Sequence, residues 1–328
     1  MSVSLPESRR VTVVSHGPNC LDGLTCAVVA ARYFEGRRFE PIFASNREID
    51  EVLQRYDPTR PENEELWITD ISWRASATDL HLDSLVERGL QLYWVDHHRT
   101  AIERRAEGYL SPKFTEFVLD EKYAACRLLF EYLVARTTSR GEKKASLAAA
   151  HALVMLADDV DRWILALDGS RRLALTVRAM EQHEAYQALL ALGPDAKLTP
   201  ELEQAARRVD EELAATFAVA EASRQVIEVP PRDLSLVAAE CDGYAGEVAD
   251  RWNAEFHRAV YALFDHRSGG VSLRRTPDCD VDLSRLAASF GGGGHPAAAG
   301  CHIPNVGKNR TSLLGRAFAD ALARGVDR

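Results

Sequence analysis

The feature that most constrains the fold is an alternation of short β-branched segments with amphipathic helical segments over the first 120 residues. Parallel strands need a crossover between them, so this alternation is typical of a mostly parallel sheet with helices on its faces. Strands are predicted at 11–15, 39–44, 66–71, 90–95 and 114–119, and helices at 24–34, 48–56, 77–88 and 123–135. An α/β fold is therefore expected here.

The second half of the chain predicts a separate, smaller unit. Thr199 and Pro200 suit the start of a helix that nothing interrupts until residue 228, and Pro230 then ends it. After that point the pattern restarts as strand, helix, strand and strand, with a helix, a glycine loop and a last helix behind them. With 328 residues the chain can bury two cores. We expect an α/β domain over 1–198, a long helical connector over 199–230 and a smaller α/β domain over 231–328.

Composition and charge exclude several classes of protein. The chain is 46% hydrophobic and 27% charged, which is typical of a globular protein, and its longest apolar stretch, 147–157, is too short to cross a membrane. A cytoplasmic location is expected, because no apolar run of signal-peptide length follows the first residues. The net charge of −9 disfavours long duplex nucleic acid as a partner, whereas bound divalent ions would still admit a small anion. Six scattered cysteines predict neither disulfides nor structural zinc.

Polar side chains gather directly after the predicted strands, where ligands of open α/β sheets bind. Four groups stand out: His16, Cys20 and Asp22; Asp70; Asp96, His97 and His98; and Asp158, Asp159 and Asp161 near the end of a helix. Taken singly, such an aspartate more often caps a turn or a helix. Imidazoles and carboxylates together, without a thiol cluster, are the donors that a pair of Mn²⁺ or Mg²⁺ ions requires. Two such ions can clamp a phosphoryl group and activate water.

The C-terminal unit offers two features that suit an anionic ligand. Gly291, Gly292, Gly293 and Gly294 lack Cβ atoms, so their backbone N–H groups could approach a phosphate, and residues 296–299 could begin a helix with its N-terminus toward the anion. His295 follows the glycines, and the guanidinium of Arg274 suits bidentate phosphate contact. The alternative interpretation of the glycines is a flexible hinge between domains.

These residues carry a resemblance to a known family. His16, Asp22, Asp70, the triplet Asp96-His97-His98, the Asp159 region and the run Gly291–Pro296 with Ala299-Gly300 resemble the DHH phosphoesterase superfamily. The C-terminal run is similar to its DHHA1 domain, and the motifs occur in the family's order over nearly the whole chain.

The resemblance implies a division of roles. His16 and Asp70 would hold one ion, and Asp22, Asp70, His97 and Asp159 the other, with Asp70 bridging. His98 would face the scissile phosphate and Asp96 would orient an imidazole, so that Asp96, His97 and His98 form the catalytic triplet. A hydroxide between two ions, expected to be Mn²⁺, would be the nucleophile. Arg274 and the loop from Gly291 to His295 would bind the remote part of the substrate.

Two positions leave alternatives open. Cys20 stands where the family's motif has an aspartate, so it is either a softer ligand that favours Zn²⁺ or Fe²⁺, or a small buried filler. Asp159 is preferred over Asp158 and Asp161 as a ligand because its four-residue spacing to Trp163 resembles the family's pattern.

The predicted function is a metal-dependent phosphoesterase acting on short nucleotides, such as oligoribonucleotides, 3′-phosphoadenosine 5′-phosphate (pAp) or dinucleotides, in a cleft between the domains. An exopolyphosphatase or pyrophosphatase-type hydrolase is the alternative enzyme. A non-catalytic nucleotide-binding regulator with a decayed metal site is the alternative from another class. The resemblance also implies a homodimer.

Overall fold

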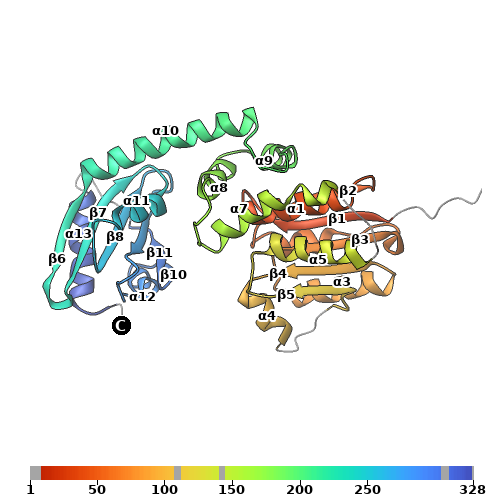
Figure 1. The fold of residues 1–328 in the computed structure, drawn as a ribbon. Helices are drawn as coiled ribbons and strands as arrows, with labels where there is room; N and C mark the ends of the chain where they lie inside the picture. Colours follow the sequence, from red (N-terminus) through yellow and green to blue (C-terminus); the bar gives the residue numbers. More distant parts are fainter. Residues whose placement is uncertain (1–8, 107–111, 140–144, 304–309, 327–328) are drawn as a thin grey trace, which may run out of the picture. The chain divides into compact units, whose positions relative to one another are not determined.

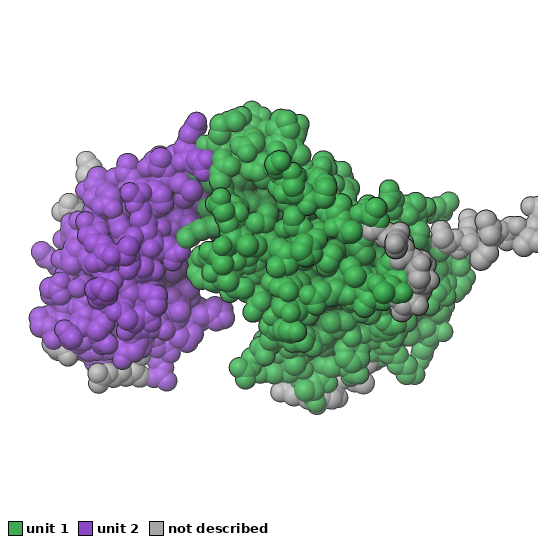
Figure 2. All heavy atoms as spheres, viewed as in Figure 1, with its two compact units in different colours: residues 1–209 green, residues 210–328 purple. Residues whose placement is uncertain are grey.

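The computed structural model describes residues 9–106, 112–139, 145–303 and 310–326. The chain forms two compact units, 1–209 and 210–328, shown in different colours in Figure 2. The boundary falls inside a long helix, α10 (Pro200–Ser223), so this helix contributes residues to both units.

Unit 1 is built on a five-stranded parallel sheet with the strand order β2-β1-β3-β4-β5 (Figure 1). Its strands are β1 (Arg10–His16), β2 (Phe39–Ala44), β3 (Glu64–Thr69), β4 (Gln91–Asp96) and β5 (Glu116–Leu119). The three central strands are buried almost throughout because helices cover both faces of the sheet. From β1 the chain goes to β2 on one side and later to β3 on the other, which leaves a crevice between β1 and β3 where ligands bind in such sheets.

Two apolar cores lie on the two faces of this sheet. Alternate residues of β1 point to opposite sides, so Val13 packs in one core and Val14 in the other. The larger core involves α1 (Leu21–Tyr33), α5 (Ala125–Ser139), α6 (Ala145–Ala148), α7 (His151–Asp161), α8 (Ser170–Arg178) and α9 (Gln182–Leu190). The smaller core involves α2 (Ile49–Arg55), α3 (Ser76–Glu87) and α4 (Arg99–Ala106). A short 3-10 turn, η1 (Pro61–Asn63), leads into β3.

Unit 2 holds a six-stranded mixed sheet with the order β10-β11-β9-β8-β7-β6. Its strands are β6 (Gln225–Val229), β7 (Leu234–Cys241), β8 (Ala259–Asp265), β9 (Val271–Arg275), β10 (Gly293–His295) and β11 (Ala298–Cys301), with the turn η2 (Pro230–Arg232). Only β7 and β8 pair in parallel. One face packs on α12 (Leu283–Ala288) and α13 (Arg310–Ala323), and the other on α11 (Ala245–Trp252).

The α/β fold predicted from the sequence is confirmed, with two local corrections. The helix expected to run to residue 228 ends at Ser223, and Gln225–Val229 is the edge strand β6, because its Val and Ile side chains pair with β7. The segment after the glycines does not begin a helix, since Gly293–His295 and Ala298–Cys301 form an antiparallel hairpin. None of the helices in the described ranges has the length and apolar character that crossing a membrane requires.

Candidate metal centre

The polar groups predicted from the sequence meet at the carboxyl edge of the unit 1 sheet. His16 is the last residue of β1, Asp70 directly follows β3 and Asp96 is the last residue of β4. β1 and β3 are neighbours, so His16 and Asp70 lie at the crevice where the strand order reverses. Topology alone therefore brings together residues that are more than fifty positions apart.

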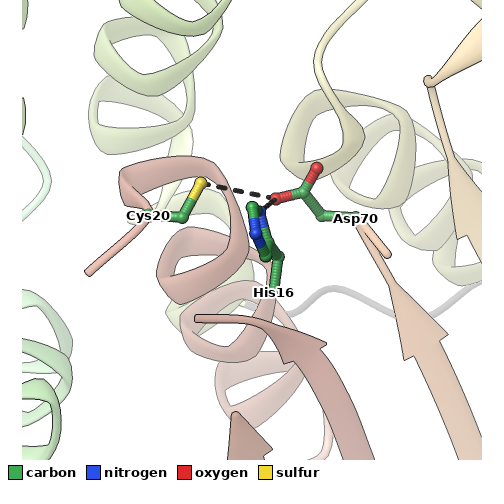
Figure 3. Close-up of side chains that lie close together, drawn as sticks. All are labelled: His16, Cys20 and Asp70. Atoms are coloured by element: carbon green, nitrogen blue, oxygen red, sulfur yellow. Dashed lines mark hydrogen bonds and ion pairs between the residues drawn. The ribbon is translucent and has the colours of Figure 1, made fainter. Parts of the chain in front are cut away.

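The first group of donors consists of His16, Cys20 and Asp70 (Figure 3). The Nδ1 atom of His16 and the Sγ atom of Cys20 each lie 3.5 Å from Oδ2 of Asp70. Cys20 precedes the first residue of α1, and this helix can approach β1 only because residue 23 is glycine. A Cβ atom on Gly23 would come within 2.2 Å of the carbonyl oxygen of His16.

The second group consists of Asp22, His97 and Asp161. The Nε2 atom of His97 lies 3.4 Å from Oδ2 of Asp161, 3.5 Å from Oδ1 of Asp70 and 3.8 Å from Oδ2 of Asp22. This nitrogen is buried, and no described residue is placed to form a hydrogen bond with it. Asp70 therefore turns Oδ2 toward the first group and Oδ1 toward the second, which is the position of a bridging carboxylate.

The buried carboxylate of Asp96 holds His97 and His98 in place. Its Oδ1 accepts hydrogen bonds from the backbone N–H groups of His97 and His98 at 2.8 and 3.0 Å, and it lies 2.7 Å from Nδ1 of His98. Ser72 donates to the other oxygen at 2.7 Å. The carboxylate is fully buried, so it fixes the ring of His98 and leaves Nε2 of that ring as its reactive nitrogen.

The electrostatics of the centre favour a cation. Burial and the charges of Asp70 and Asp161 raise the pKa of Asp22, and burial and Asp70 raise the pKa of Asp161. Burial also opposes ionisation of Asp70, but contacts with His16 and His97 outweigh it and lower the pKa of Asp70. For His97 the three carboxylates overcome burial and raise the pKa. The site thus concentrates acidic groups whose mutual repulsion bound positive charge would relieve.

The donor set fits divalent metal ions. Ligand atoms of an ion with bonds of about 2.1 Å lie roughly 3 to 4 Å apart. The donor atoms within each group all lie within 4.8 Å of one another, and the pairs with Asp70 or His97 lie 3.4 to 3.8 Å apart. The buried Nε2 of His97 lies among three carboxylate oxygens without a hydrogen bond to a described residue, which is the arrangement expected of a ligand atom. Burial, Asp70 and Asp22 raise the pKa of the Cys20 thiol, so Cys20 would need a bound cation to become a thiolate ligand.

Of the three aspartates of α7, Asp161 lies among the donors, whereas Asp159 faces the loop that follows the helix. The carboxylate of Asp159 accepts hydrogen bonds from the loop that follows α7: the N–H groups of Ala166 and Leu167 at 2.9 and 3.2 Å and the hydroxyl of Ser170 at 2.5 Å. These bonds overcome the effect of burial and lower the pKa of Asp159. The geometry therefore favours Asp161 as the ligand in place of Asp159.

Asp158 has a third role. It accepts from the N–H of Ala124 at 2.8 Å and pairs with Arg127 at 2.9 Å, so it anchors the start of α5. Asp22 also anchors the start of α5, because its two oxygens accept hydrogen bonds from the N–H groups of Ala125 and Cys126. Each carboxylate oxygen of Asp22 has a second lone pair for an ion. Neither contact could be read from the spacing of the aspartates.

In unit 2 the predicted substrate residues share one face of the sheet. His295 pairs with Ala298, and Ala298 pairs with Arg274 on the next strand. Directly opposed residues point to the same side, so His295 and Arg274 lie on one face about 10 Å apart across two strand spacings. The glycines have a packing role as well. A Cβ on Gly292 would come within 2.1 Å of the carbonyl oxygen of Gly300, and one on Gly294 within 2.5 Å of Ala299.

Comparison with known proteins agrees with these motifs. Residues 235–323 match the DHHA1 domain. The oligoribonuclease NrnB of Bacillus subtilis is 24% identical over 316 residues, which cover 87% of this chain and 71% of the relative. Residues 235–323 therefore form a DHHA1 domain, and the relative found over most of the chain supports the resemblance to the DHH superfamily.

Solved structures share the fold of this chain. The pGpG-specific phosphodiesterase PggH of Vibrio cholerae matches with a TM-score of 0.60 and 13% identity, covering 98% of this chain and all of the other. Exonuclease RecJ bound to manganese matches with a TM-score of 0.57 and 17% identity, covering 99% of this chain and 92% of the other. At this level of identity the likeness concerns the fold.

Proposed function

We propose that this protein is a metal-dependent phosphoesterase of the DHH superfamily that hydrolyses phosphoester bonds of short nucleotides. The observation that carries the proposal is the convergence of His16, Asp22, Asp70, His97 and Asp161 at one sheet edge, with Nε2 of His97 buried and unpartnered among the carboxylates. No side-chain nucleophile is required of such a site.

Two divalent ions would be held by the two groups of donors. His16, Asp70 and Cys20 would hold one ion, and Asp22, His97 and Asp161 the other, while Asp70 would contribute one oxygen to each. Bound ions of this kind activate water and polarise a phosphoryl oxygen. Mn²⁺ suits the oxygen and imidazole donors, whereas the sulfur of Cys20 would shift the first position toward Zn²⁺ or Fe²⁺.

The other residues of the triplet would act on the substrate through protons and orientation. Asp96 accepts from Nδ1 of His98, so the neutral ring has its proton on Nδ1, and Nε2 can donate only in the charged, doubly protonated form. The hydrogen bond to Asp96 and the charges of Asp96 and Asp70 raise the pKa of His98, which favours that charged form. His98 would then donate a hydrogen bond to a phosphoryl oxygen or protonate the leaving oxygen.

A short nucleotide is the substrate class with the most support. The named relatives include an oligoribonuclease and a pGpG-specific phosphodiesterase. The net charge of −9 disfavours tracking along a long polyanion. Arg274 and His295, on one face of the unit 2 sheet, would bind the remote phosphate.

The test compares Mn²⁺-dependent release from pGpG, pApA, pAp and polyphosphate by the purified chain. Asp70→Asn should lower the rate at least about 100-fold, and asparagine tolerates the left-handed backbone at this position (φ 58°). Asp57→Asn, an exposed carboxylate paired with Arg88, is the matched control and should change nothing. Preference for polyphosphate would make the chain a phosphoanhydride hydrolase, and nucleotide binding without turnover under any metal would make it a regulator.

A further inference from the structure

The segment that joins α7 to α8 begins directly after Asp161, a donor of the candidate metal centre, and exposes apolar side chains. Trp163, Ile164 and Leu167 are 57%, 49% and 40% exposed, and they make up three of the nine large hydrophobic residues that stand out from the surface of the described ranges. The other four tryptophans of the chain are at most 2% exposed. A concentration of apolar surface at one short segment indicates a binding role.

The segment lies within reach of the donors. Asp161, which ends α7, is 3.4 Å from Nε2 of His97, and the Cα of Trp163 is at most about 7.6 Å from that of Asp161 across two trans peptide units. The backbone of Trp163 therefore lies close to the donors, within the span of a nucleotide whose phosphoryl group would bind there.

The segment is held in a fixed conformation rather than left loose. The carboxylate of Asp159 accepts three hydrogen bonds from residues 166, 167 and 170. The backbone carbonyl oxygen of Asp159 accepts two more, from the N–H groups of Ile164 and Leu165 at 2.8 and 3.3 Å. Trp163 and Leu165 both adopt the left-handed region, with φ of 55° and 54°, which is uncommon for residues other than glycine. Leu165 packs against the larger core. A strained turn that directs an indole outward indicates function rather than packing.

The surroundings of the ring suit the base of a nucleotide. The guanidinium of Arg171 lies over the indole of Trp163, 5.4 Å from its centroid, so one face of the ring is next to a cation while more than half of the side chain remains exposed. An exposed aromatic face stacks on any nucleobase.

We propose that Trp163 is the stacking platform for a base of the nucleotide substrate and that Asp159 is the positioning residue that holds it. The inference rests on the proposed function, because it assigns the base to the site whose metal centre would hold the phosphoryl group. In this assignment the buried carboxylate of Asp159, two residues from the donor Asp161, fixes the loop that carries Trp163.

Binding of the base can be measured without turnover, because Trp163 is the exposed fluorophore of the chain. AMP should quench the tryptophan emission of the unchanged protein in the presence of Mn²⁺, whereas ribose 5-phosphate, which lacks only the base, should not. Trp163→Phe should abolish the quenching, since the four remaining tryptophans are buried.

Kinetics with pApA provide the second measurement. Trp163→Ala should raise KM about 5- to 150-fold with little change in kcat, and Trp163→Phe should restore most of the loss because it keeps a ring. Leu80→Ala removes an equally exposed apolar side chain from α3 and should leave KM unchanged. Asp159→Asn should raise KM in the same direction as Trp163→Ala.

The outcomes separate this inference from the proposed function. If pApA is hydrolysed but AMP and ribose 5-phosphate quench alike, or neither quenches, the base binds elsewhere and the assignment of Trp163 is overturned. If AMP quenches selectively but pApA is not hydrolysed, the stacking surface stands and the phosphoesterase proposal fails.

Discussion

Replacing Asp159 and Asp161 by asparagine one at a time should have opposite effects on stability and on metal binding. The two carboxylates are two residues apart, yet one holds a loop and the other faces His97. In Asp159→Asn, either orientation of the amide leaves at least one donor among Ala166, Leu167 and Ser170 without an acceptor. A buried unsatisfied donor costs about 2 kcal/mol.

That cost predicts a melting temperature lower by about 4 to 8 °C for a unit of this size. Because the pKa of Asp159 is lowered in the folded protein, its stabilising effect is present above the unfolded pKa, about 4, and is lost as the pH falls. The difference between the unchanged protein and Asp159→Asn should therefore shrink below about pH 4.

Asp161→Asn should behave differently. Burial and Asp70 already disfavour the charged form of Asp161, so the metal-free variant should melt at or above the temperature of the unchanged protein. An ion at 1,000 times its Kd stabilises a protein by about 4 kcal/mol, and a 10- to 100-fold loss of affinity removes about 1.4 to 2.7 kcal/mol of that. Thermal melts with EDTA and with graded Mn²⁺ measure both quantities. If Asp159→Asn and not Asp161→Asn cancelled the Mn²⁺-dependent shift, our assignment of the ligands would be refuted.

Three further predictions concern the same centre. Gly23→Ala should lower the melting temperature and weaken Mn²⁺ binding, because its Cβ would lie 2.2 Å from the carbonyl oxygen of His16, whereas Gly246→Ala in α11 has open space and should be neutral or stabilising by up to about 1 kcal/mol. Cys20→Asp should shift metal preference from Zn²⁺ toward Mn²⁺ in a competition titration, and an unchanged preference would show that the thiol is a filler. Removal of metal by EDTA should lower the melting temperature of unit 1 and leave unit 2 unchanged in domain-resolved calorimetry; equal shifts would contradict the location of the site.

The fold was readable from the sequence because its pattern is local. Runs such as Phe39–Ala44 and Val271–Arg275 are bounded by polar residues or glycine, and the structure has strands at these positions. The predicted long helix extends too far because Gln225–Val229 contains no helix-breaking residue. Only the pairing with β7 makes this segment a strand. Tertiary contacts override propensity in such segments.

The candidate site was readable only in part. Residues directly after strands, such as His16 and Asp70, are placed by the topology of a parallel sheet, so their meeting follows from the pattern. The choice among the three aspartates of α7 depends on which helical face meets the sheet and which meets the following loop. The spacing of the aspartates does not show which helical face meets the sheet and which meets the loop. The sequence favoured Asp159 because of its spacing to Trp163, but Trp163 lies in the loop that the carboxylate of Asp159 holds.

The parallel sheet of unit 1 also places the candidate ligands and some of the connecting turns at opposite ends of the strands. All donors of the candidate centre lie at one end of the strands or on the helices that follow, while turns such as the one at Gly36 lie at the opposite end, where a Cβ would meet no atom within 4 Å. Peptide tags or fluorescent labels inserted at that turn would lie a full strand length from the candidate metal centre, so the protein can be immobilised or tracked there while the candidate centre stays accessible.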